Sequence, residues 1–227
     1  MSYQSEDIKV TSAKVEEYLE AIYKLAQTDG HVRVHKLSEC LKVSPSAVTD
    51  MLKKMARDGY IERVQEGIVL TQKGEKAAVG LVRQHRLWER FLTDILGISW
   101  DKVHDEACKL EHVSSPEVQD GLERLLSSPD TCPHGHPIPS KDGVYAKQNT
   151  RPLADLESGS EALIVKITEE EPKMLQYLAT LGLIPKVQIT VEEIAPFRGP
   201  LLVKVGSAKY ALGREVASKI EVAEIHN

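Results

Sequence analysis

Apolar residues recur at intervals of three and four along the start of the chain, which is the period of an amphipathic helix. The stripe consists of Val15, Leu19, Ile22 and Ala26. Because Ser12 is a suitable N-cap, we expect this helix to run from Ser12 to about Gln27. Glu17 and Glu20 lie three residues apart on its opposite side. They face away from the core that the stripe serves, so they are either two solvated acids or groups that serve a neighbouring domain.

The pattern that follows predicts two shorter helices and a hairpin. In chain order we expect a strand at 31–34, helices at 35–42 and 45–58, and strands at 61–64 and 68–71. Ser44 followed by Pro45 is a strong helix start, because serine caps a helix and proline fits its first turn. Gly67 lies in the turn between the two strands. This order is a winged helix-turn-helix, whose second helix enters the major groove of DNA.

Longer periodic segments make up the middle of the chain. A helix is expected from 72 to about 96, followed by helices at 104–113 and 117–126. Together they carry more apolar surface than one packed layer uses, which is typical of proteins that self-associate. The sequence therefore predicts a helical dimerisation domain and a homodimer.

Beyond residue 140 the pattern changes to short strand-like runs. They lie at 162–167, 187–194, 201–205 and 220–225, with one short helix at 173–181. These lengths fit a small, half-open β-barrel of the SH3 type. We therefore predict a mainly α protein with a β C-terminal part. Its regions are a winged helix-turn-helix domain at 1–78, a helical metal-binding and dimerisation domain at 79–140, a linker at 141–158 and an SH3-like domain at 159–227.

Charge supports DNA binding only when it is counted locally. The whole chain has a net charge of −5. Between Arg33 and Val64, however, seven Lys and Arg stand against four Asp and Glu, a net of +3. The side chains expected to meet bases or phosphates are Lys42, Ser44, Ser46, Thr49, Asp50, Lys53, Lys54, Arg57 and Arg63. The alternative is a three-helix scaffold that touches no nucleic acid.

Metal-capable side chains gather on one predicted helix. His104, Cys108, Glu111 and His112 stand at i, i+4, i+7 and i+8, which places them on one face. The preceding helix carries a further i, i+4 pair, His85 and Glu89, and a Pro- and Gly-rich loop carries Cys132 and His134. A lone His or Cys on a helix is usually structural, but this many together indicate one or two metal sites. Thiolate, imidazole and carboxylate ligands suit Fe(II), Mn(II), Co(II), Ni(II) or Zn(II) rather than Ca(II) or Mg(II).

A metal ion would explain why Glu17 and Glu20 face away from the core of their own domain. If they share an ion with the His104 face, metal binding fixes the DNA-binding domain on the dimerisation domain. In a dimer this fixes the spacing of two recognition helices, which is what a palindromic operator reads. The hypothesis from the residues is a metal-gated repressor.

Other classes find less support in the sequence. A metallohydrolase is disfavoured because there is no HExxH motif and no nucleophile elbow, so we do not expect an enzyme. A metal-buffering protein, or one whose SH3-like domain binds peptides, stays open as an alternative. The three cysteines form no CxxC pair, the N-terminus has no secretory signal, and no apolar run reaches the ~20 residues that span a bilayer. We expect a cytoplasmic protein that does not bind membranes.

Six stretches distributed along the chain are EEYLEAIYKL, SPSAVTDMLKKMARDGYI, VLTQKGEKAA, VRQHRLWERFLTDILGI, VHDEACKLEH and CPHGHPIP. Through them the chain resembles, over essentially its whole length, the diphtheria-toxin-repressor family of iron- and manganese-dependent transcriptional regulators. The resemblance implies a winged-helix domain, a helical dimerisation domain and an SH3-like (FeoA-like) domain. It also implies a homodimer that binds operators of metal-uptake and homeostasis genes.

The resemblance also implies ligand sets. The primary site would use Glu17, Cys108, Glu111 and His112, with Glu20 as a further acid. The ancillary site would use His85, Glu89 and His104 with Glu171 from the SH3-like domain, or else Glu89, Cys132 and His134. Cys108 matches the iron-type members, whereas the acids at 17 and 20 match the manganese type. We favour Fe(II) over Mn(II) because of the thiolate, and we expect Co(II), Ni(II) and Zn(II) to bind in vitro.

Overall fold

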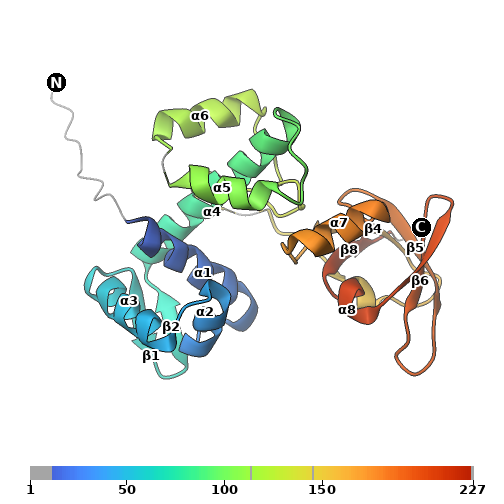
Figure 1. Ribbon diagram of the computed structural model, residues 1–227, viewed down its shortest axis with the longest axis horizontal. Helices are drawn as coiled ribbons and strands as arrows, with labels where there is room; N and C mark the ends of the chain where they lie inside the picture. Colours follow the sequence, from blue (N-terminus) through green and yellow to red (C-terminus); the bar gives the residue numbers. More distant parts are fainter. Residues whose placement is uncertain (1–11, 113, 145, 226–227) are drawn as a thin grey trace. The chain divides into compact units, whose positions relative to one another are not determined.

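The computed structural model describes residues 12–112, 114–144 and 146–225 (Figure 1). By its contacts the chain divides into two units. One comprises residues 1–83 with 141–143, and the other comprises residues 84–140 with 144–227. No helix among the described residues is both long and apolar enough to cross a membrane.

The first unit is a winged helix-turn-helix. Its elements are α1 (Ala13–Asp29), α2 (Val34–Leu41), α3 (Pro45–Arg57), β1 (Ile61–Val64) and β2 (Gly67–Leu70). The two strands pair antiparallel with Ile61 opposite Leu70. Ser44 caps α3 as predicted, because its hydroxyl accepts the Ala47 N–H at 3.3 Å. The helices bury an apolar core that includes Leu19, Ile22, Leu37, Val48, Leu52 and Met55.

The strand predicted at 31–34 is reduced to a single bridge. Val32 pairs with Ile68 of β2, and helix α2 already begins at Val34. Gly67 explains how the two backbones come so close. A Cβ at this position would lie 2.7 Å from the carbonyl oxygen of Val32. Strand β2 of the wing, the β1–β2 hairpin, thus pairs both with β1 and with the segment before α2.

Helix α4 (Gln72–Asp94) is continuous across the predicted domain boundary after residue 78. Within the second unit it is followed by α5 (Val103–Glu111) and α6 (Pro116–Leu125). Leu92 of α4 packs with Val103 and Ala107 of α5 in a small apolar cluster. These contacts hold α4 and α5 together and fix the faces that carry the candidate ligands.

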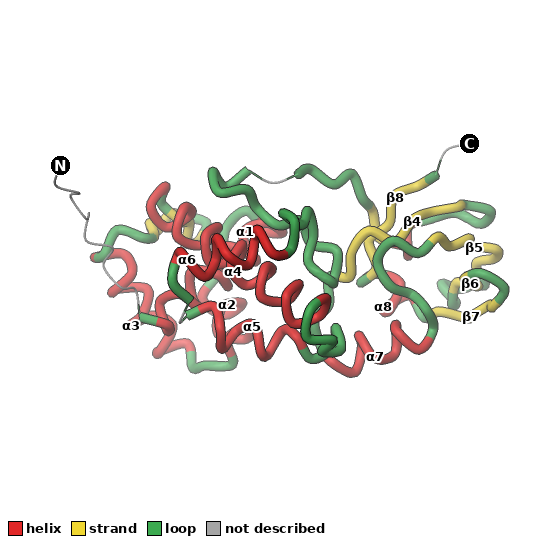
Figure 2. The backbone as a smooth tube through the Cα atoms, turned by 90° about the horizontal axis from the view of Figure 1, so that it is seen from above, coloured by secondary structure: helices red, strands yellow, loops and turns green. Residues whose placement is uncertain are grey.

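The remainder of the second unit is a β domain with a six-stranded antiparallel sheet in the order β3-β8-β4-β5-β6-β7. Its elements are β3 (Arg151–Pro152), η1 (Leu153–Asp155), β4 (Glu161–Ile167), α7 (Pro172–Thr180), β5 (Gln188–Ile194), β6 (Leu201–Val205), β7 (Ala208–Leu212), α8 (Arg214–Ala217) and β8 (Ile220–Glu224). Figure 2 shows strands β4 to β8 curving together, with α7 and α8 beside them. The interior of the domain is lined by fully buried Val, Ile and Leu side chains.

The structure of this domain differs from the prediction in two places. Strand β7 and helix α8 were not predicted. Residues 151–156 were placed in a linker, but Leu153 and Leu156 are buried in the β core. Pro152, Ser158 and Gly159 gave this stretch the composition of a linker. The two leucines that anchor it are too few to show a period.

Candidate metal centre and DNA-binding surface

Helices α4 and α5 bring three candidate ligands together. His85 and Glu89 stand one turn apart on α4 and are only 2% and 1% exposed. His104 and Cys108 stand one turn apart on α5. His85 Nε2 lies 3.1 Å from His104 Nδ1, and the Cys108 sulfur lies 3.7 Å from His104 Nε2. The ligand atoms of His85, His104 and Cys108 lie within 4.8 Å of one another, which is close enough to share one ion.

His85 links this group to two buried carboxylates. Its Nδ1 lies 2.5 Å from Glu111 Oε2, and its Nε2 lies 3.2 Å from Glu89 Oε1. His112, the residue that ends α5, has its Nε2 3.4 Å from Glu111 Oε1. The residues predicted from the α5 pattern therefore lie in one connected network with the α4 pair.

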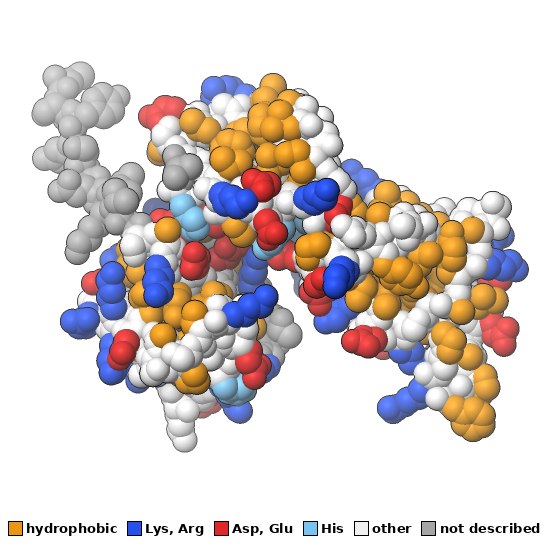
Figure 3. Space-filling model, in the orientation of Figure 1, with side chains coloured by type: hydrophobic (Ala, Val, Ile, Leu, Met, Phe, Trp, Pro, Cys, Tyr) orange, Lys and Arg blue, Asp and Glu red, His pale blue; other side chains and the backbone are white. Residues whose placement is uncertain are grey.

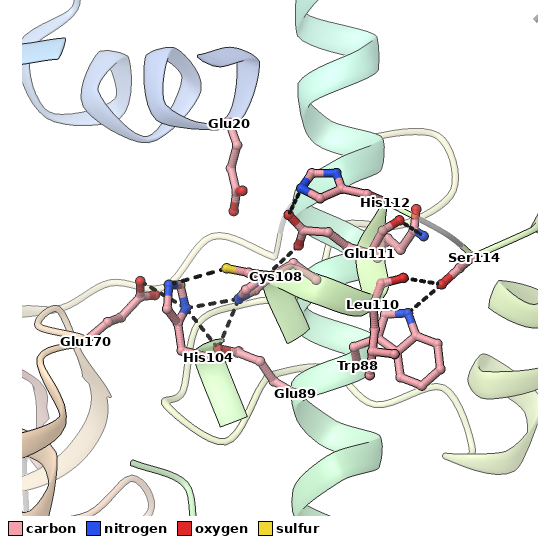
Figure 4. Close-up of polar contacts among 12 residues, drawn as sticks. Glu20, Trp88, Glu89, His104, Cys108, Leu110, Glu111, His112, Ser114 and Glu170 are labelled. Atoms are coloured by element: carbon pink, nitrogen blue, oxygen red, sulfur yellow. Dashed lines mark hydrogen bonds and ion pairs between the residues drawn. The ribbon is translucent and has the colours of Figure 1, made fainter. Parts of the chain in front are cut away.

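Hydrogen bonds from α4 hold the end of α5 in place. The Trp88 indole N–H donates to Ser114 Oγ at 2.7 Å, and that hydroxyl donates to the Leu110 carbonyl (Figure 4). The Gln84 side-chain amide donates to the Glu111 carbonyl and accepts from Gln119 of α6 at 2.7 Å. The turn that carries Glu111 is thus held by hydrogen bonds from two side chains of α4, Trp88 and Gln84.

A second group forms where the loop 131–137 meets α4. It consists of Glu89, Cys132 and His134, all buried, with ligand atoms within 4.8 Å of one another. His134 Nε2 bonds to the carbonyl of Trp100 at 2.7 Å. Its Nδ1 lies 3.3 Å from Glu89 Oε1 and has no hydrogen-bond partner among the described residues. A buried ring nitrogen held in this way, facing a thiol and a carboxylate, is the arrangement of a metal-ligating histidine.

A third group includes a carboxylate that sequence reasoning missed. His104 Nδ1 lies 3.4 Å from Glu170 Oε2 and 3.6 Å from Glu89 Oε1. Glu171, the predicted ligand from the β domain, instead caps α7 by accepting the Met174 N–H at 2.9 Å. Pro172 indicates this role in the sequence, because a proline at the first helical position makes the residue before it the N-cap. The acid beside the metal groups is therefore Glu170.

The buried histidines and carboxylates shift one another's pKa values. Burial lowers the pKa of a histidine, but Glu89, Cys108 and Glu111 raise that of His85 well above its ordinary value. The pKa of His104 is raised to about 10, since Cys108, Glu89 and Glu170 outweigh burial and the charge of His85. Burial would also raise the pKa of Glu89, but the histidines around it hold that pKa well below its ordinary value. His85 and His104 on one side and Glu89 on the other thus stabilise one another's charged forms.

The two cysteines respond differently to their surroundings. Burial raises the pKa of Cys108, but contacts with His104 and His85 outweigh it and lower the pKa overall. Burial and the charge of Glu89 raise the pKa of Cys132, despite His134 and Arg86. The pKa of His134 is raised to about 11 by Cys132 and Glu89, against the effect of burial.

The two remaining predicted ligands belong to α1 in the first unit. Glu17 is exposed. Glu20 is 9% exposed, and its carboxylate pairs with Lys24 one turn further along at 3.2 Å. The different exposures of Glu17 and Glu20 distinguish two side chains that the sequence pattern treated alike.

The predicted DNA-binding residues form a polar surface on α3 and the wing. Eight of them are exposed, and Thr49 is half-buried. Asp50 and Lys53 form an ion pair of 3.0 Å on the exposed face, so the acid at a base-reading position is partly neutralised by its neighbour. The Thr49 hydroxyl donates to the Pro45 carbonyl at 2.8 Å. The exposed residues are Lys42, Ser44, Ser46, Asp50, Lys53, Lys54, Arg57 and Arg63.

The fold and the site define a class of protein: a winged-helix transcription regulator with a metal-binding helical domain and a small β domain. Family models agree over three segments. Residues 10–67 match the N-terminal DNA-binding domain of iron-dependent repressors, residues 71–140 match their metal-binding and dimerisation domain, and residues 151–224 match the FeoA domain.

Several repressors are similar to this chain. The iron-dependent repressor IdeR of Mycobacterium leprae is 31% identical, with 92% of this chain and 96% of that protein covered. The diphtheria toxin repressor of Corynebacterium diphtheriae is 38% identical over 56% of this chain and 57% of that protein. A solved manganese-dependent transcriptional repressor in complex with manganese has a TM-score of 0.84 and 32% identity, covering 93% of this chain and 100% of that one.

The chain belongs to the diphtheria-toxin-repressor family and is a metal-dependent transcriptional repressor. The predicted fold class, the family and its DNA-binding character are confirmed. The relatives are repressors and not enzymes, so the prediction of a non-enzymatic protein is also confirmed.

Proposed function

We propose that a divalent metal ion is the co-repressor of this protein. The observation that carries the proposal is the overlap of three potential ligand groups around α4 and α5: His104 belongs to two of them, and Glu89 belongs to two. Burying this many ionisable groups costs free energy, because charged groups lose their hydration. A bound cation compensates that cost. We therefore assign metal sensing to this cluster.

The primary site comprises Cys108, Glu111 and His112 of the helical domain, together with Glu17 and Glu20 of α1. The α1 acids come from the DNA-binding domain, so an ion held by both sets favours one arrangement of the two domains. His85, Glu89 and His104 with Glu170, or Glu89 with Cys132 and His134, form the ancillary site. When bound, the ion would supply a positive charge that these ligands share.

The protein acts as a homodimer on palindromic operator DNA. Exposed apolar side chains on the helical domain support self-association. They include Ile95, Leu96, Val118 and Leu125, which are 44% to 57% exposed. Figure 3 shows apolar side chains gathered over the part of this domain that carries α6. Fixing the two winged-helix domains in a dimer sets the spacing of the two α3 helices, and that spacing selects the half-sites of an operator.

We favour Fe(II) as the physiological metal, with Mn(II) as the competing ion. Thiolate ligation by Cys108 and Cys132 suits the softer Fe(II), whereas the carboxylates suit Mn(II). Relatives named for iron and for manganese occur at similar identity. Co(II), Ni(II) and Zn(II) should also bind in vitro by the Irving–Williams order.

Fluorescence anisotropy tests the proposal. A labelled palindromic promoter fragment is titrated with protein under anaerobic conditions, first with chelator and then with Fe(II) or Mn(II). We expect metal to tighten binding by about 100-fold or more, which corresponds to a coupling free energy near 3 kcal/mol. Equal affinity in chelator and in metal contradicts a co-repressor role.

A further inference from the structure

The edge of β4 in the second unit is completed by a loop of the helical domain. Strand β4 pairs with β8 along one edge, and β5 covers only residues 161–163 of the other. Further along that second edge, the Ile167 N–H donates to the carbonyl of His134 at 2.9 Å. An unpaired strand edge exposes backbone donors and acceptors that readily take a partner. The loop 131–137 is that partner here.

A β-bulge in β4 prepares this contact. The register with β8 shifts between Ile164 and Lys166, so Val165 is left out of the ladder. A bulge bends its strand and changes the direction of the groups at the unpaired residue. The backbone of Gly135 in the loop lies close to the Val165 carbonyl. A Cβ built on Gly135 would lie 2.0 Å from that oxygen.

Gly135 is suited to this position for two reasons. Its φ is +88°, a conformation that L-residues with side chains rarely adopt. The missing side chain also lets its backbone lie against Val165 and Lys166, whose Cα would be 2.8 Å from a Cβ. Any larger residue would separate the loop from the strand.

Side chains extend the contact on both sides of Gly135. The His136 ring bonds through Nε2 to the Ile167 carbonyl at 2.9 Å, and Gln148 donates to the Gly135 carbonyl at 3.0 Å. Further away, Gln176 of α7 donates to Asp101 Oδ2 at 2.7 Å, and Trp100 packs against the β core. The joint is mostly backbone and neutral side chains, so it does not need a metal ion.

The same loop is fixed to α4, next to the metal ligands. Arg86 donates to the Pro137 carbonyl at 2.5 Å, and Arg90 donates to the Thr131 carbonyl at 2.8 Å. Cys132 and His134 therefore lie on a loop that is held by α4 on one side and by β4 on the other.

We propose that loop 131–137 is a docking element that holds the β domain on the helical domain without metal, with Gly135 as its required residue. We infer further that this docking positions Cys132 and His134 beside Glu89. The second part rests on the proposed metal-binding function, while the first part does not. The β domain then acts as a structural support for a metal site, in addition to the single carboxylate of Glu170.

Two glycines provide a matched test. Gly159 has a φ of +89°, close to that of Gly135, but a Cβ there meets nothing within 4 Å. Gly135→Ala and Gly159→Ala thus introduce similar backbone strain, and only the first adds a collision with Val165. The readout is amide hydrogen exchange of Ile167 in the full-length, metal-free protein, with amides of β6 as the control for folding.

We expect Gly135→Ala to accelerate exchange at Ile167 by about 100-fold or more, with β6 unaffected, and Gly159→Ala to change it by less than about threefold. Unchanged protection of Ile167 in Gly135→Ala overturns the proposal. If Gly135→Ala also loses protection in β6, His136→Ala takes its place as the test variant. It removes the loop's side-chain contact with the Ile167 carbonyl and should accelerate exchange at Ile167 by about threefold or more. No change in this variant overturns the proposal equally.

Co(II) absorption tests the second part separately. The experiment uses a Cys108→Ser variant, so that Cys132 is the thiol available to the buried ligand groups. A sulfur-to-Co(II) charge-transfer band in this variant reports Co(II) at Glu89, Cys132 and His134, provided that adding Cys132→Ser abolishes the band. Adding Gly135→Ala should weaken Co(II) binding at this band by about tenfold or more, and adding Gly159→Ala should not. Equal Co(II) affinity in the two overturns the inferred positioning. Absence of the band in the Cys108→Ser background removes the second metal site from the proposed function but leaves the docking result intact.

Discussion

Cys108 and Cys132 lie in the same buried network, but different parts of the structure position them there. Cys108 is half-buried on α5, one turn from His104, and its spacing on the helix brings it to the cluster. Cys132 is 2% exposed in an irregular loop, more than forty residues from Glu89 in sequence, and tertiary contacts bring it there. A site on a helix is fixed by local structure, whereas a site on a loop depends on whatever holds the loop. We therefore expect Cys108 to dominate the metal response and Cys132 to modulate it.

Replacing Cys108 should have the largest effect. Cys108→Ala removes the thiolate from the primary site, so metal should no longer tighten DNA binding, and a gain of about 100-fold should fall to within about threefold. Anisotropy with chelator and with Fe(II) measures it.

The matched control is Cys132→Ala, which should keep a metal-dependent gain of about tenfold or more. Both variants should keep the wild-type far-UV circular dichroism. If Cys132→Ala loses as much as Cys108→Ala, the proposed ranking of the two cysteines is wrong.

Thiol reactivity should separate the same two residues without metal. Cys108 has a lowered pKa and is partly accessible, whereas Cys132 is buried and has a raised pKa. Because the thiolate is the reactive form, Cys108 should react with a disulfide reagent about 30-fold faster or more. The measurement uses metal-free protein in a Cys40→Ser background, since Cys40 is exposed. Metal should protect Cys108, and similar rates for both thiols would count against the geometry.

The pH dependence follows from the raised pKa values of the histidines. His104 and His134, with pKa values of about 10 and about 11, are protonated near neutral pH and must lose protons to bind metal. Metal affinity should therefore rise with pH between about 6 and 8, roughly tenfold per pH unit for each proton released. Calorimetry in buffers of different ionisation enthalpy counts those protons.

The metal-free protein should show the opposite trend. The folded-state pKa of these histidines lies above the ordinary value of 6.5. Their contribution to stability is therefore fully present below pH 6.5 and is lost as the pH rises toward about 10. Chelator-treated protein should become easier to denature with urea over this range. A metal affinity that is independent of pH would contradict the expected release of protons from these histidines.

The smallest expected effect is on the DNA-binding surface. Lys54→Ala removes one exposed cation of α3, so the slope of log affinity against log salt should fall by about one, and binding should weaken a few-fold at all sequences. Glu62→Ala, on β1 of the wing, removes an exposed acid and serves as the charge control. An unchanged salt slope would place Lys54 away from the phosphates.

The sequence predicted the helical part of this molecule better than the loops. The i, i+4 spacings of His85 with Glu89 and of His104 with Cys108 indicated which residues share a face, because helix geometry is local. The structure places Glu170 beside His104, whereas the predicted Glu171 caps α7. A run of three acids has no period, and only the capping of α7 distinguishes them. The burial of Leu153 and Leu156 and the existence of β7 depend on the completed sheet, which no single segment encodes.

The measurement that tests the central claim most directly is the fate of a preformed complex. Protein, Fe(II) and labelled operator DNA are mixed under anaerobic conditions, excess chelator is added, and anisotropy is followed over time. If the metal is the co-repressor, the complex dissociates after the metal is removed, and added Fe(II) restores it. A complex that persists at the same affinity after complete metal removal would contradict metal gating.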